Sequence, residues 1–204
     1  MDDTLIETKK AKYKAHKHAA KKFYNYDLKD AELNALWGKP FPLLVEGLYG
    51  QFVPVEKAIE NYYLIGHEFP IDAYQGALEL LTTLSHTHLL GLVTAANGPL
   101  MISALGDAEI PISLFEYVQS SDDTPAHKPD PEVFAPSLEY FGRKGIKSEE
   151  ILYVGDAISD LQAAHGAGIG FVGIAGHTTP KHKFEEVGGH YVESFPQLID
   201  LVMS

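Results

Sequence analysis

Residues Tyr153–Asp160 read YVGDAISD, and this stretch decides the fold class. An apolar run, Ile151–Val154, ends at Gly155, and two carboxylates, Asp156 and Asp160, follow at a spacing of four residues. A buried strand that ends in this way carries acidic side chains to the carboxyl edge of a parallel sheet, where open α/β folds bind ligands. Two carboxylates at that edge suit Mg²⁺, which prefers hard oxygen ligands. The stretch therefore predicts an α/β fold with a divalent cation site.

The chain on both sides of this stretch alternates between strand and helix patterns from about Asp72 onward. The expected strands are His88–Thr94, Leu114–Val118, Ile151–Val154, Ile169–Ile174 and His190–Val192, and the expected helices are Ala73–Leu84, Pro99–Leu105, Pro131–Phe141, Asp160–His165 and Phe195–Met203. Parallel strands need crossover connections, and helices between successive strands supply them. We therefore expect an α/β fold with a Rossmann-like parallel sheet core.

The segment from about Thr8 to Pro70 has a different pattern, with helical composition and no convincing strand. The expected helices are Thr8–Phe23, Leu28–Trp37, Leu43–Gly50 and Val55–His67. This pattern predicts an inserted α-helical cap domain over residues 8–71. The α/β core would then consist of residues 1–7 and 72–204.

Composition narrows the possible functions. The 204 residues include no cysteine, so disulfides, a cysteine nucleophile and thiolate metal ligands are excluded. The formal net charge of −12 disfavours nucleic acid as a partner. No apolar run approaches the roughly 18 residues of a spanning helix, and no apolar signal segment is evident, so we expect a cytoplasmic protein without a membrane partner.

Four short signals follow one another along the chain. They are the opening Asp2–Leu5 (DDTL), Thr94 at the end of an expected strand, Lys128 within HKPDPEVF, and the pair Asp156 and Asp160. In this order and at these separations the set resembles the haloacid dehalogenase-like superfamily of hydrolases. It is most similar to the branch with a helical cap after the first motif, which includes phosphoglycolate phosphatase-like enzymes.

The resemblance implies a role for each of these residues. Asp2 matches the general acid and base, whose backbone carbonyl also binds Mg²⁺. Thr94 matches the hydroxyl that holds the phosphoryl group, and Lys128 matches the lysine that neutralises its charge. Asp156 matches the metal-binding acid, with Asp160 as a further ligand or as a residue that supports the ligands. Thr4 matches the first motif's threonine, which we place among the substrate-binding residues, although an ordinary turn hydroxyl is the other interpretation.

The chain departs from the family pattern at its start. The nucleophilic aspartate of the family lies two residues before Asp2, and Met1 fills the position between. The apolar strand that precedes this motif is also absent, which would leave two flanking strand edges unpaired. Two explanations stay open: a native chain that begins further upstream, or a relative without catalytic activity that only binds its ligand.

The expected function is hydrolysis of a small phosphorylated metabolite by a Mg²⁺-dependent phosphatase through an aspartyl-phosphate. The alternatives are an inactive phospho-ligand-binding protein and a phosphosugar mutase of the β-phosphoglucomutase kind, and the protein would be a monomer or a homodimer. The loop His177–Pro180 follows the last long strand on the edge that faces the site. It could contact the phosphate, although an ordinary loop is the simpler interpretation.

Overall fold

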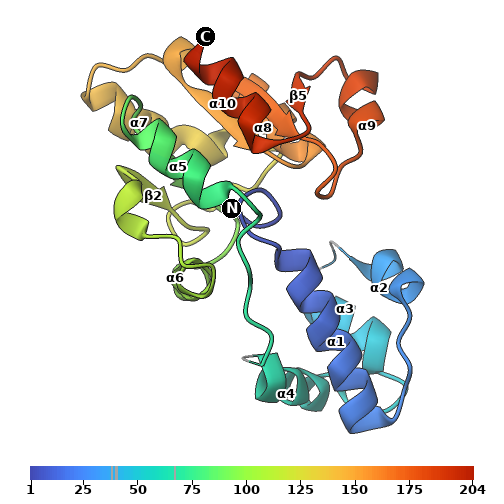
Figure 1. Cartoon of the computed structure of the whole chain (residues 1–204). Coiled ribbons are helices and arrows are strands. Elements are labelled where there is room, and N and C mark those ends of the chain that lie inside the picture. Colours follow the sequence, from blue (N-terminus) through green and yellow to red (C-terminus); the bar gives the residue numbers. More distant parts are fainter. Residues whose placement is uncertain (38, 40, 67) are drawn as a thin grey trace. The chain divides into compact units, whose positions relative to one another are not determined.

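The computed structural model describes residues 1–37, 39, 41–66 and 68–204, which form two compact units. The first unit combines Met1–Glu7 with Ala73–Ser204, and the second consists of Thr8–Asp72. Figure 1 shows the chain leaving the first unit after its short N-terminal turn and returning to it before helix α5. The predicted insertion, residues 8–71, differs from the second unit by one residue.

All regular elements in the described part of the second unit are helices. Its helices are α1 (Thr8–Tyr24), α2 (Asp30–Leu36), α3 (Phe41–Tyr49) and α4 (Val55–Gly66). Each expected helix is found with ends shifted by up to two residues, and His67, which the prediction included, lies outside the described residues.

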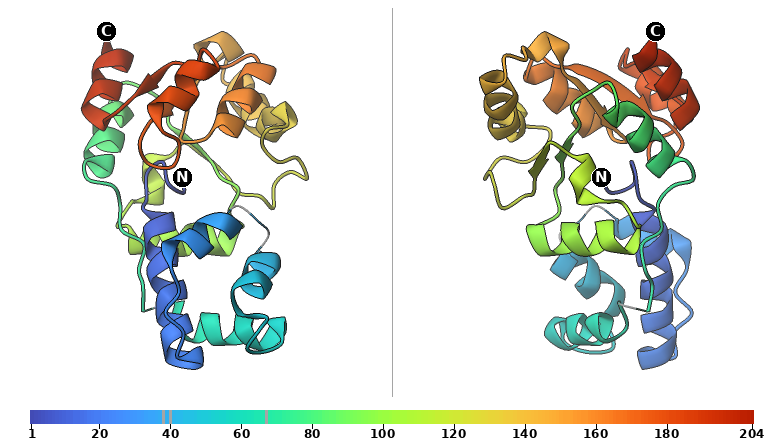
Figure 2. Two further views of the ribbon diagram at one scale, coloured as in Figure 1. Left: turned by 90° about the vertical axis from the view of Figure 1, so that its right-hand side faces the viewer. Right: turned by 60° about the vertical axis from the view of Figure 1, so that its left-hand side comes forward.

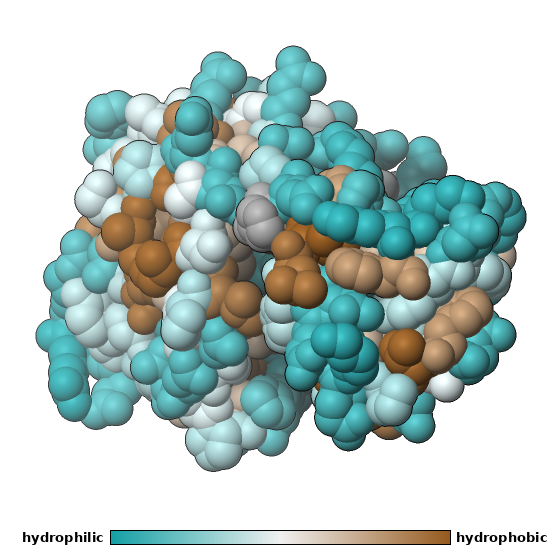
Figure 3. All heavy atoms as spheres, turned by 90° about the horizontal axis from the view of Figure 1, so that it is seen from below, coloured by the Kyte–Doolittle hydropathy of each residue, from teal (hydrophilic) through white to brown (hydrophobic). Residues whose placement is uncertain are grey.

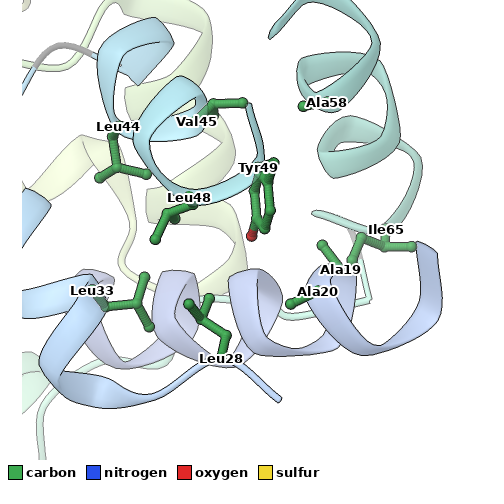
Figure 4. Packing of buried hydrophobic residues seen from close by; sticks show 10 residues of the cluster. All are labelled: Ala19, Ala20, Leu28, Leu33, Leu44, Val45, Leu48, Tyr49, Ala58 and Ile65. Carbon is green, nitrogen blue, oxygen red and sulfur yellow. The ribbon is translucent and has the colours of Figure 1, made fainter. Parts of the chain in front are cut away.

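Apolar side chains from the helices of this unit pack into one cluster. Figure 4 shows the ring of Tyr49 directed from α3 toward Ala19 and Ala20 of α1, where small side chains leave room for it. Leu33 and Ile65 are fully buried in the same cluster. Burial of apolar area of this kind is the main term that stabilises a small helical unit.

The first unit contains two parallel sheets. Strand β1 (Gly91–Val93) pairs with β2 (Tyr117–Gln119), whereas β3 (Leu152–Gly155), β4 (Gly170–Ile174) and β5 (Tyr191–Val192) form the second sheet in that order. All pairings between these described strands are parallel, which confirms the predicted α/β class.

Helices precede, connect and follow these strands. They are α5 (Ala77–Ser85), α6 (Gly98–Asp107), α7 (Ala135–Arg143), α8 (Ile158–Gly166), α9 (Lys181–Glu186) and α10 (Phe195–Met203), with 3-10 turns at Ile112–Leu114, Pro131–Phe134 and Ser148–Glu150. Both views of Figure 2 show α5 and α10 side by side in this unit.

An apolar cavity of about 450 Å³ is bordered by the two sheets. All three residues of β1 and the first three of β3 line it, together with apolar side chains of α5, α7 and α10. Strands β1 and β3 belong to different sheets and are not paired with each other.

Several predicted elements need correction. The predicted strand His88–Thr94 is reduced to Gly91–Val93, and the predicted helix Pro131–Phe141 begins as a 3-10 turn before α7. The predicted helix Ala73–Leu84 begins only at Ala77, because Ala73 bridges to Ile6 in extended conformation and Gly76 then takes a φ of +87°. The predicted strand Leu114–Val118 is instead a 3-10 turn followed by β2, since the Leu114 N–H bonds to the carbonyl of Pro111.

One face of the surface can be followed in a space-filling view. The face drawn in Figure 3 is mostly hydrophilic, with scattered apolar patches between teal side chains. No helix in the described ranges is long and apolar enough to cross a membrane.

Candidate active site

The N-terminal turn places Asp2 and Thr4 against the ends of the strands. Its backbone closes through bonds from Asp3 N to Ile6 O (2.8 Å) and from Leu5 N to Met1 O (2.9 Å), with a φ of +50° at Asp3. Asp3 tolerates this left-handed conformation better than most residues because a short acidic side chain can bond locally. The turn is thus a defined structure, and it holds the two motif residues in place.

Thr94 lies directly after β1, at the carboxyl edge of its sheet. Its N–H bonds to the carbonyl of Gln119 at 3.0 Å, which extends the β1–β2 ladder by one residue. Its hydroxyl donates to Oδ2 of Asp2 at 3.2 Å and accepts from the N–H of Ala96 at 3.2 Å. Two of the predicted site residues, Asp2 and Thr94, are therefore in direct contact.

Asp156 lies after β3 and is buried. Its Oδ1 accepts a hydrogen bond from Thr4 Oγ1 at 2.7 Å, and the same hydroxyl lies 3.5 Å from the carbonyl of Asp2. Thr178 Oγ1 contacts the carbonyl of Asp156 at 3.0 Å and also bonds to its Oδ2. Thr4 thereby brings the carboxylate of Asp156 close to the backbone oxygen of Asp2.

Lys128 forms the most buried ion pair described in the protein. Its Nζ lies 2.6 Å from Oδ1 of Asp160 and 2.8 Å from the phenol oxygen of Tyr153, and the two paired side chains are 16% and 5% exposed. Thr94 and Lys128 also line one small pocket of about 10 Å³. Burial opposes the charge of Lys128, but Tyr153 and Asp160 outweigh it and raise the pKa of the lysine. Lys128 is therefore a cation at neutral pH.

Asp160 holds the turn that presents Asp156. Its Oδ2 accepts the backbone N–H groups of Asp156 and Ala157, each at 3.1 Å, which caps the first turn of α8. This contact starts the helix at Ile158, two residues before the predicted start. A Cβ at Gly155 would lie 2.4 Å from the same oxygen, so only glycine fits there.

These contacts bear on the predicted metal site. No group of three or more His, Asp or Glu side chains in the described part of the chain could hold a metal ion, so Asp2, Asp156 and Asp160 do not form a three-carboxylate cage. One oxygen of Asp160 is paired with the charged Nζ of Lys128 and the other accepts two backbone N–H groups, whereas the oxygens of Asp156 accept only neutral threonine hydroxyls. Mg²⁺, however, is commonly held by one or two carboxylates plus waters and substrate oxygens. Asp156 and the carbonyl of Asp2 provide such hard oxygen donors.

Three contributing residues were missed or undervalued by sequence reasoning. Tyr153 bonds to Lys128, and Tyr74 stacks on His177 with ring centroids 3.6 Å apart and planes within 8°. Thr178 bonds to Asp156, although an ordinary loop was the interpretation preferred from the sequence over a contact with the phosphate. The position of Thr178 after β4, at the same edge as Thr94, was the available signal. Nothing in the sequence pattern marks Tyr74 or Tyr153.

A comparison with family models assigns the chain to a family. The model of haloacid dehalogenase-like hydrolases matches residues 1–174. The chain belongs to this family. Its curated relatives include the PpaX protein of Caldanaerobacter subterraneus subsp. tengcongensis, 24% identical over 99% of this chain and 91% of that protein. The phosphoglycolate phosphatase of Salmonella choleraesuis is 39% identical over 59% of this chain, an alignment that spans 46% of that enzyme.

Solved structures of family members share the fold. A β-phosphoglucomutase-type protein from Thermotoga maritima superposes with a TM-score of 0.86 at 19% identity, covering 100% of this chain and 95% of its own. The hydrolase YfnB of Bacillus subtilis, solved with bound magnesium, gives 0.76 at 17% identity, covering 98% and 95%. These similarities establish the fold, and they do not identify a substrate.

Proposed function

We propose that this protein is a Mg²⁺-dependent phosphatase that hydrolyses a small phosphorylated metabolite through an aspartyl-phosphate. One observation carries the proposal: the side chain of Asp2 contacts Thr94, while Thr4 joins the backbone of Asp2 to the carboxylate of Asp156. The side chain of Asp2, the hydroxyl of Thr94 and the carboxylate of Asp156 thus lie close together. Membership of a hydrolase family with phosphatase relatives supports the same conclusion.

The residues suit the demands of phosphoryl transfer. This reaction requires alignment of the reacting atoms and stabilisation of charge on the phosphoryl oxygens. Thr94 offers a hydroxyl and Lys128 a positive charge, which together would hold the phosphoryl group. Asp2, at 3.2 Å from Thr94, would give a proton to the leaving oxygen and later take one from water.

A cation at this site would add charge neutralisation. Asp156 and the carbonyl of Asp2 would hold Mg²⁺, and Asp160 would keep Asp156 in position through the backbone of the turn. When bound, the metal would neutralise negative charge on the phosphate oxygens.

In the family that the chain resembles, the attacking carboxylate stands two residues before Asp2, and we propose that an aspartate at that position forms the aspartyl-phosphate. We also propose that the second unit, Thr8–Asp72, serves as the cap that excludes water and selects the leaving group, as mobile lids do in other enzymes.

The test is phosphate release from a panel of small phosphomonoesters by protein purified from its native source. We expect turnover that depends on Mg²⁺ and is stopped by a chelator. Asp156→Asn should lose most of this activity, because it weakens the metal site. Asp200→Asn is the matched control, since Asp200 is an exposed acid in α10, and it should keep full activity.

The remaining outcomes distinguish the alternatives. Isomerisation of a phosphosugar without net phosphate release would identify a mutase. Phosphate-ester binding without any turnover would identify a binding protein. Unchanged turnover in Asp156→Asn would overturn the metal assignment.

A further inference from the structure

The loop after β4 contacts two parts of the candidate site, the N-terminal turn and Asp156. Gly176, with a φ of +96°, bonds through its N–H to the carbonyl of Thr179 at 2.9 Å, which closes a tight turn. The two residues inside this turn, His177 and Thr178, direct their side chains to different partners. A glycine at position 176 permits the turn because it takes the left-handed conformation without steric cost.

His177 contacts the N-terminal turn. Its Nδ1 lies 3.0 Å from the carbonyl of Asp3, and because a carbonyl only accepts, this nitrogen carries the proton. The imidazole stacks on Tyr74, and the ring of Phe195 meets it edge-on at 6.0 Å. Ring packing on two sides therefore fixes the direction of the Nδ1–H donor. The acceptor, Asp3, sits between Asp2 and Thr4 in the motif turn.

Thr178 contacts Asp156. Its hydroxyl reaches both the carbonyl and Oδ2 of Asp156, while the opposite oxygen, Oδ1, accepts from Thr4. Both oxygens of Asp156 are thus held by threonine hydroxyls, one from the N-terminal turn and one from the β4 loop. Outer contacts of this kind orient the oxygens that face a metal or substrate.

We infer that His177 and Thr178 are a pair of positioning residues that fix the N-terminal turn and Asp156 relative to each other. The contact of His177 is with the backbone of Asp3, so its action reaches the acid Asp2 through the main chain. The contact of Thr178 orients the proposed metal ligand directly. This inference deepens the proposed function and rests on it.

The first test is spectroscopic and needs no catalysis. Long-range proton–nitrogen NMR correlation of ¹⁵N-histidine-labelled protein reports which ring nitrogen of His177 is protonated. We expect the Nδ1–H form, with the resonance assigned by its loss in His177→Phe. A neutral ring protonated only at Nε2 would overturn the contact with Asp3, because Nδ1 would then have no proton to donate.

The second test is kinetic. His177→Phe keeps the stack on Tyr74 but removes the donor, whereas His177→Asn replaces the donor with an amide N–H. We expect His177→Phe to lower kcat about tenfold with KM changed less than about threefold, and His177→Asn to recover part of kcat. Equal loss in both variants, or a change confined to KM, would contradict the positioning role.

The third test concerns the metal. Calorimetric titration of the metal-free protein with Mg²⁺ should show about tenfold weaker binding in Thr178→Val and near wild-type binding in Thr178→Ser, which retains the hydroxyl. Thr82→Val, an exposed threonine of α5, is the control and should match wild type. Unchanged Mg²⁺ affinity in Thr178→Val would refute the inference for this residue.

These readouts separate the two proposals. Absence of turnover in the wild-type protein would refute the proposed phosphatase, while the tautomer and the Mg²⁺ affinities would still decide the positioning pair. Normal turnover together with an Nε2–H tautomer and an unchanged Thr178→Val would refute the pair alone.

Discussion

The buried ion pair between Lys128 and Asp160 leads to a sharp prediction about Asp160→Asn. The pair spans 2.6 Å, with side chains 16% and 5% exposed, and the other oxygen of Asp160 accepts two backbone N–H groups. An asparagine keeps one acceptor oxygen. Its amide N–H₂ must therefore face either the lysine ammonium or the two N–H donors, and one set of buried groups loses its partner.

The size of the effect follows from this geometry. Removing one partner of a buried pair leaves an uncompensated charge, which costs about 3–5 kcal/mol. The control is Glu186→Gln, which breaks the Lys183–Glu186 pair, where the side chains are 51% and 56% exposed. Exposed pairs of that kind contribute roughly 0–1 kcal/mol.

The assay is urea unfolding followed by circular dichroism, because the single tryptophan, Trp37, belongs to the second unit and would not report on this site. We expect Asp160→Asn to lose several-fold more free energy of unfolding than Glu186→Gln. Comparable losses of less than about 1 kcal/mol in both variants would refute the view that Asp160 holds Lys128 and the turn.

Three further predictions concern other parts of the molecule. Burial lowers the pKa of His16 to about 4, so protonation of this side chain favours the unfolded chain. The free energy of unfolding of the second unit should therefore fall by up to about 1.4 kcal/mol for each pH unit as the pH drops from about 6.5 toward 4. Unfolding followed by Trp37 fluorescence measures this, and a flat pH profile would contradict it. Gly155→Ala should lose activity and at least about 1–3 kcal/mol of stability, because its Cβ would lie 2.4 Å from Oδ2 of Asp160. A melting temperature equal to that of the wild-type protein would contradict this prediction. The apolar cavity of about 450 Å³ should enhance the fluorescence of a hydrophobic dye, and Leu152→Glu at its lining should reduce that enhancement; equal signals would place the dye elsewhere.

Elements with a strong periodic pattern were predicted well from the sequence. The helix Phe195–Met203 was placed at its observed bounds, and β4 differs from its predicted range by one residue. Errors occurred where a tertiary contact overrides local preference. Ala73 bridges to Ile6 rather than starting α5, and no local pattern encodes that pairing.

Candidate site residues were predictable only where a motif marks them. The contacts of Asp2 with Thr94 and of Thr4 with Asp156 join positions far apart in the chain that the order of motifs had grouped into one candidate site. The bond from Lys128 to Tyr153 was not anticipated, because it depends on how a loop folds back over a strand. Aromatic neighbours of this kind carry no sequence signature.

The most direct test of the central claim is the intact mass of protein from its native source, mixed with a substrate from the phosphomonoester panel and quenched in acid. The account predicts a mass increase of one phosphoryl group that hydroxylamine removes. After trypsin digestion, the modification should lie in the peptide that contains Asp2 and ends at Lys9. Phosphate release without a covalent phosphoryl group, or a phosphoryl group on any other peptide, would contradict the account.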